Sequence, residues 1–129
     1  MPDYTNTKFE ITILADCIFK LKSFKDVEID VEDVYEMRKQ YLHFSNGKPF
    51  AILMDATDYS SVTAEARILL VDKEFIKMRI ATAFVTRSIA SNLIANFFIK
   101  FHKPASPTKL FKDFDTAFEW LKQQTESQK

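Results

Sequence analysis

A single glycine, Gly47, is the feature that most constrains what this chain of 129 residues can form. At the usual frequency of ~7%, a globular chain of this length would carry about nine glycines. Motifs that need several glycines at fixed positions are therefore excluded, namely the P-loop, the Gly-rich dinucleotide turn and the nucleophile elbow. One cysteine and two histidines also leave too few ligands for a disulfide framework or a multi-cysteine metal site. We therefore expect no cofactor.

The length predicts one domain over residues 1–129, with an ordered core at about 7–124. The first residues lack the pattern of a signal peptide, and no apolar run approaches the ~20 residues of a membrane span. The 18 basic and 18 acidic side chains cancel, so no overall field favours nucleic acid. We predict a cytoplasmic protein that neither spans a membrane nor binds nucleic acid.

The charges are unevenly distributed along the chain. Acidic side chains concentrate between Asp26 and Glu36, whereas no acid occurs between Glu74 and Asp113. Lysines and arginines are the only charged side chains in that second segment. Such a run is usually a solvated face, and the alternative is a surface for an anion or an acidic partner.

The N-terminal half predicts a hairpin, a helix and a buried strand. Residues 8–14 and 18–24 alternate apolar and polar side chains, as half-buried strands do, and their short link favours an antiparallel hairpin. A helix is expected from its N-cap, Asp30, to a stop at Gly47, which can adopt a left-handed conformation. Residues 50–54 are a continuous apolar run, typical of a strand buried on both faces. The helix side chains expected on one face are Val31, Val34, Tyr35, Tyr41 and Leu42.

The C-terminal half predicts an alternation of helices and strands. The expected elements are a helix over 62–78 capped by Ser61 or Thr63, a strand over 80–86, a helix over 88–101, a strand over 108–111, and a last helix capped by Asp113 or Asp115. On the first of these helices, Ile68, Val71, Phe75 and Met78 share a face. The order β-β-α-β-α-β-α-β-α predicts an α/β fold with a mixed, mostly parallel sheet of about five strands, an N-terminal antiparallel hairpin and about four helices.

This element order, together with several short runs, resembles the STAS-like, SpoIIAA-like proteins of bacteria, which are anti-sigma-factor-antagonist-like domains. The runs that carry the resemblance are Ile52-Leu53-Met54-Asp55, the Ser60-Ser61 turn, the apolar segment 92–98 and the closing segment 111–121. The resemblance spans most of the chain and implies a single-domain STAS-like sandwich.

The resemblance also implies a regulatory site. In signalling members of the family, a serine at the start of the helix after the Asp-ending strand is phosphorylated by a partner kinase, and the added charge decides docking. The matching positions are Ser60, Ser61 and Thr63, flanked by Tyr59 and Val62 where the family has Asp and Gly. Helix capping alone also explains hydroxyls at these positions.

Polar side chains are expected where two parallel strands end, the edge at which open α/β sheets bind ligands. Asp55 and Asp58 follow one strand, where they either stabilise a turn or, as a pair of carboxylates, hold a cation or act as acid and base. Arg87 and Ser88 follow the next strand, where they either cap a helix or bind an anion, with Arg79 or Lys109 nearby.

We cannot assemble a nucleophile, a base and oxyanion donors from these residues, so we predict no enzymatic activity. The preferred function is a STAS-like regulatory or interaction module that binds a protein partner. One version of this hypothesis places the module under the control of phosphorylation at the Ser60, Ser61 and Thr63 turn. The alternative is a carrier or sensor that binds a small apolar or anionic ligand near Arg87 and the expected helix over 88–101, which is rich in phenylalanine. The stripe of Phe97, Phe98 and Phe101 is expected in the core, whereas Ile99 and the nearby Trp120 are candidates for a homodimer surface or the lining of an apolar pocket.

Overall fold

A six-stranded sheet organises the residues that the computed structural model describes, namely 1–58, 60–86 and 106–127. The strands follow the order β1-β2-β3-β5-β7-β8, antiparallel from β1 to β3 and parallel from β3 to β8. Their bounds are β1 Tyr4–Thr5, β2 Phe9–Ala15, β3 Ile18–Ser23, β5 Phe50–Asp55, β7 Arg79–Val85 and β8 Thr108–Phe111. The mixed, mostly parallel sheet and its N-terminal hairpin confirm the predicted fold class.

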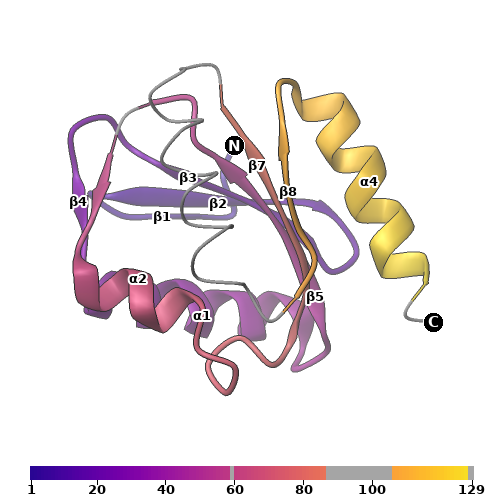
Figure 1. Cartoon of the computed structure of the whole chain (residues 1–129), viewed down its shortest axis with the longest axis horizontal. Helices are drawn as coiled ribbons and strands as arrows, with labels where there is room; N and C mark the ends of the chain where they lie inside the picture. Colours follow the sequence, from indigo (N-terminus) through magenta and orange to yellow (C-terminus); the bar gives the residue numbers. More distant parts are fainter. Residues whose placement is uncertain (59, 87–105, 128–129) are drawn as a thin grey trace.

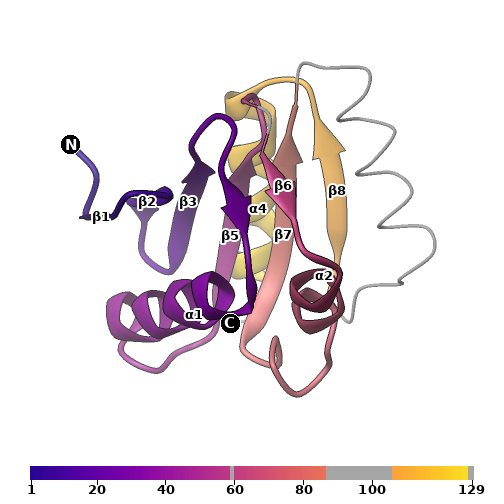
Figure 2. The same ribbon diagram turned by 90° about the vertical axis from the view of Figure 1, so that its left-hand side faces the viewer.

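Helices cover both faces of this sheet (Figure 1). The helices α1 (Val31–Ser45) and α2 (Ala64–Leu70) pack on one face, and α4 (Phe114–Glu126) packs on the other (Figure 2). Because neighbouring strand residues point to opposite faces, β5 contributes Phe50 and Ile52 to the α1 core and Ala51 and Leu53 to the α4 core. In the part of the chain described, no helix is long and apolar enough to cross a membrane.

The first helix begins and ends where the sequence predicts. Asp30 is the N-cap, and its carboxylate accepts the Asp33 N–H while the Asp33 carboxylate accepts the Asp30 N–H. After the helix, Asn46 and Gly47 both adopt positive φ angles. The predicted face is partly wrong: Tyr35 is 52% exposed, and the buried residues include Met37.

The second helix is shorter than predicted. The predicted start at Val62 is wrong because Ser61–Val62 form β6, which pairs in parallel with β4 (Glu28–Ile29). Thr63 is the N-cap, as one of the two predicted options, and the helix ends at Leu70. Beyond it, the Asp72 carboxylate accepts the Phe75 N–H, so the chain turns before Met78. The predicted apolar face therefore does not form, and Ile68 on it is 64% exposed.

The last helix is capped by Asp113, whose carboxylate accepts the Thr116 N–H. It buries Ala117 and Leu121 against the small side chains of β7, while Phe114 and Phe118 are half-buried. The predicted helix over 88–101, with Phe97, Phe98 and Phe101, lies outside the described residues.

Candidate functional site

Asp55, the last residue of β5, and Asp58, three residues later, each contact a nearby polar group. Asp55 is 8% exposed, and its carboxylate accepts hydrogen bonds from the Thr57 N–H at 3.1 Å and the Thr57 hydroxyl at 2.6 Å. The Asp58 carboxylate lies 3.6 Å from the Lys22 ammonium on β3. No group of three or more metal-ligating side chains forms among the described residues. Asp55 therefore makes a local contact within the turn after β5, and Asp58 links that turn to β3.

The predicted anion site after β7 cannot include Arg79. Arg79 is the first residue of β7, and Val85 is the last. At a rise of ~3.3 Å per residue, these two residues lie about 20 Å apart. Arg87 and Ser88 follow the far end and lie outside the described residues. Lys109 is an exposed residue of β8, beside Ala83 in the middle of β7, with its ammonium 5.4 Å from the Phe111 ring centroid.

The three hydroxyls of the predicted phosphorylation site lie in different settings. The Thr63 hydroxyl accepts the Ala66 N–H at 3.2 Å and so caps α2. Ser61 belongs to β6, directly opposite Glu28 of β4, and its N–H donates to the Val27 carbonyl at 3.0 Å. Ser60 and Ser61 are half-buried. Only Thr63 therefore acts as the helix cap.

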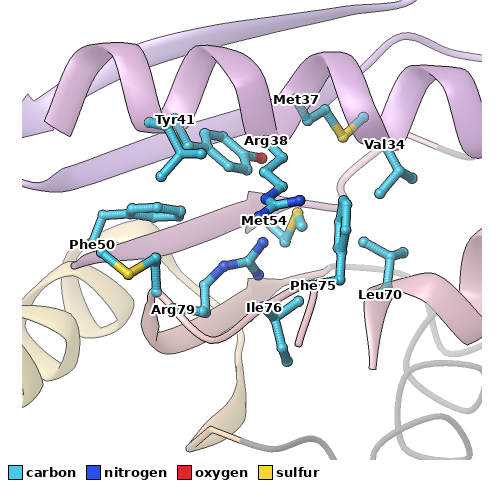
Figure 3. A pocket seen from close by; sticks show the side chains of 12 residues that line it. Val34, Met37, Arg38, Tyr41, Phe50, Met54, Leu70, Phe75, Ile76 and Arg79 are labelled. Carbon is cyan, nitrogen blue, oxygen red and sulfur yellow. The ribbon is translucent and has the colours of Figure 1, made fainter. Parts of the chain in front are cut away.

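A small pocket lies between α1, β5 and the segment that leads into β7. Its volume is about 10 Å³, which is about the space that one water needs. Apart from Arg38, Tyr41 and Arg79, all the side chains that line it are apolar. Figure 3 shows that these three polar groups converge on the same space from opposite sides.

The half-buried Arg79 side chain lines this pocket, and no carboxylate of the described residues pairs with its guanidinium. One of its terminal nitrogens, Nη1, donates to the Thr82 hydroxyl at 3.0 Å, while Nε is buried and has no hydrogen-bond partner among the same residues. Its central carbon lies 5.6 Å from the Tyr41 ring centroid and 5.9 Å from that of Phe50. Burial lowers the pKa of Arg79, yet a guanidinium keeps its charge in proteins. The pocket therefore holds a partly desolvated cation, whose Nε is its buried part.

Two further groups complete the polar part of the pocket. The Arg38 guanidinium lies 4.8 Å from the Phe75 ring centroid and is half-buried. The Tyr41 side chain is 1% exposed, and its hydroxyl has no hydrogen-bond partner in the described part of the chain. Burial raises the pKa of Tyr41, so this hydroxyl stays neutral and can donate. The arrangement offers donors to an anion rather than carboxylate or imidazole ligands to a metal ion.

Sequence reasoning missed this pocket. A bulge in β7 is the cause: Arg79 pairs with Phe50 and Ala81 with Ala51, so Ile80 is an extra residue. The bulge breaks the alternation of the strand, and Arg79 faces α1 although Ala81 faces α4. The acid-free segment after Glu74 was the available signal, since it contains Arg79.

Comparison with known proteins places the chain in a family. A family model described as a domain of unknown function, DUF7793, matches residues 12–125. The chain belongs to the DUF7793 family. No curated protein matches this member of the family significantly.

Two solved structures share the fold of this DUF7793 member. An uncharacterized DUF3478 protein with a SpoIIAA-like fold, from Shewanella loihica PV-4, has a TM-score of 0.63 and 18% identity, covering 92% of this chain and 98% of that one. The anti-sigma factor antagonist SpoIIAA in its unphosphorylated form has a TM-score of 0.54 and 12% identity, covering 88% and 97%. Both likenesses confirm the predicted SpoIIAA-like fold.

Proposed function

We propose that this chain is a non-catalytic regulatory module that binds a protein partner, and that phosphorylation of Ser61 controls the binding. The observation that carries the proposal is the position of Ser61 in the β4–β6 pair, directly opposite Glu28. This short pair joins the loop after β5 to the chain that enters α1. A chemical change at Ser61 therefore acts on two segments of the surface at once.

A phosphate at Ser61 is expected to open this pair. It would add about −1.5 to −2 charges at neutral pH, on a strand only ~4.8 Å from its neighbour. The neighbouring residue is the exposed carboxylate Glu28, so the two like charges repel. The Lys8 ammonium binds the Glu28 carbonyl and the Asp33 carboxylate, so it is already engaged. Loss of the pair would release the loop and change the surface that a partner meets.

The first test is phosphate transfer by kinases in an extract of the cell that encodes the protein. Intact-mass measurement should detect one added phosphate on the wild-type chain and on the Ser60→Ala and Thr63→Ala variants, but none on Ser61→Ala. The same phosphate on all variants, or on none of them, would contradict the role of Ser61.

The second test uses Ser61→Glu as a charge substitute and Ser61→Ala as its uncharged control. The Ser61 N–H donates to Val27 and the Thr63 N–H to Ile29, so both amides should exchange faster with deuterium in Ser61→Glu. A partner captured from the extract by the wild-type chain should be lost from Ser61→Glu and kept by Ser61→Ala. Equal exchange, or equal capture by both variants, would refute the proposed control.

A further inference from the structure

The two arginines of the pocket formed by Arg38, Tyr41 and Arg79 have no carboxylate partner in the chain. All 18 side-chain carboxylates of the chain lie in the described residues, and none of them forms an ion pair with either arginine. The segment 87–105 contains no Asp or Glu, so it has no carboxylate to offer. Both arginines are half-buried, and partial desolvation makes an unpaired charge unfavourable. The chain therefore supplies no carboxylate to offset the charge of either guanidinium.

The contacts among the described residues account for only part of the Arg79 guanidinium. The rings of Tyr41 and Phe50 stabilise its face, and Thr82 accepts from Nη1. The Nε group remains enclosed and unbonded by these residues, as does the Tyr41 hydroxyl. Arg38 points toward the same space from α1 (Figure 3), so two like charges converge there. A bound anion would both accept from the unused donors and offset the repulsion between the two guanidinium groups.

We propose that this pocket binds an oxyanion, a carboxylate or a phosphate carried by a small apolar molecule. Guanidinium groups match both oxyanions because their planar donors bind two oxygens at once. The rest of the lining is apolar and includes Met37, Met54 and Met78, whose unbranched side chains adapt to irregular shapes. The cavity of about 10 Å³ admits little more than one water. The ligand therefore enters as the methionines and the half-buried Arg38 shift.

This site is independent of the proposed regulation through Ser61. Its polar residues belong to α1 and to the start of β7, whereas Ser61 belongs to the β4–β6 pair. The phosphate that would control partner binding is covalent, and the ligand of the pocket is free. Either proposal can therefore fail without the other.

The test measures binding of four probes to the whole chain by calorimetry and by thermal melting at constant ionic strength. The probes are acetate, hexanoate, phenyl phosphate and inorganic phosphate. We expect saturable binding of hexanoate or phenyl phosphate at one site, with a rise in Tm. Arg38→Gln and Arg79→Met should each weaken the binding at least tenfold. Lys109→Met, which removes a charge from exposed β8 outside the pocket, should bind as the wild type does.

The probes also distinguish the two head groups. Preference for hexanoate assigns a carboxylate ligand, preference for phenyl phosphate assigns a phosphate ester, and equal binding by acetate or inorganic phosphate assigns recognition of the head group alone. If Arg79→Met does not fold, Arg38→Gln decides, because the Arg38 side chain is half-buried at the edge of the pocket. Absence of saturable binding of every probe at millimolar concentration, or equal weakening by Lys109→Met, would overturn the proposal.

Discussion

Replacing Tyr41 with phenylalanine is expected to stabilise the ligand-free protein, although the substitution removes a polar group from the core. The Tyr41 ring packs on Phe19, with ring centroids 6.2 Å apart, and on Phe50, with centroids 5.3 Å apart. Phenylalanine keeps both contacts, as well as the contact with the Arg79 guanidinium. Only the hydroxyl is lost, and this hydroxyl is buried without a hydrogen-bond partner among the described residues.

The expected magnitude follows from the cost of such a group. A buried hydroxyl without a partner destabilises a fold by about 1–3 kcal/mol. The adjoining cavity is large enough for about one water, which places the cost at the low end of that range. We therefore expect Tyr41→Phe to raise the free energy of unfolding by about 1 kcal/mol. For a domain of this size, that gain corresponds to a Tm higher by roughly 3–5 °C.

Urea unfolding and thermal melting of the ligand-free protein measure this gain, with Tyr4→Phe as a matched control. The Tyr4 hydroxyl donates to the Glu36 carboxylate at 3.1 Å and accepts from the Asn6 amide at 3.3 Å. Its removal should lower the free energy of unfolding by about 1 kcal/mol. Opposite signs for the two variants support the reasoning. A loss of stability in Tyr41→Phe equal to that in Tyr4→Phe would refute it, because the Tyr41 hydroxyl would then be bonded.

Two further predictions concern stability. Gly47 has a φ of 76°, and a Cβ atom at this position would meet no other atom within 4 Å. Gly47→Ala should therefore lower the free energy of unfolding, measured in urea, by about 1–2 kcal/mol through backbone strain alone, and Gly47→Asn should lower it by less. Equal stability of Gly47→Ala and the wild type would contradict this prediction. The pKa values of Asp30 and Asp113 are held low, chiefly by the N–H groups of Asp33 and Thr116. The two carboxylates contribute fully to the stability of the fold above their unfolded pKa near 3.8, and this contribution is lost as the pH falls through their lower folded pKa values. The Tm should therefore drop toward pH 3, and the drop should be less steep in Asp113→Asn.

The elements that the sequence predicts correctly depend on local interactions. Asp30 and Asp113 begin their helices because each carboxylate accepts an N–H three residues later, a contact that needs no knowledge of the fold. The errors on α1 and α2 are of another kind. Periodicity places Tyr35 and Ile68 among apolar neighbours, yet which flank of a helix meets the sheet depends on how the layers pack. Tyr35 instead lies outside, with its ring edge-on to Phe75 at 5.3 Å.

The candidate site could not be predicted because it depends on long-range geometry. The sequence suggests an anion site at Arg87, with Arg79 or Lys109 nearby. The bulge at Ile80 directs Arg79 toward α1, and a bulge arises from the pairing of β7 with β5. Tyr41 is predicted on the buried face of its helix and lies there, but its unbonded hydroxyl becomes visible only when its neighbours are placed.

The pocket therefore combines features that weaken the fold at one position. The partly desolvated Arg79 guanidinium, the Arg38 guanidinium on the other side of the pocket and the unbonded Tyr41 hydroxyl all oppose folding. Natural sequences keep such conflicts chiefly at functional sites. A purely structural role and a ligand role predict different effects of Arg79→Met on two quantities, the stability of the free protein and its stabilisation by an anion. If the three groups serve only packing, Arg79→Met destabilises the free protein, because it removes the contacts with the Tyr41 and Phe50 rings and the hydrogen bond to Thr82, and it leaves the response to anions unchanged. If they serve a ligand, the same variant stabilises the free protein and loses the protection that an anion gives to the wild type.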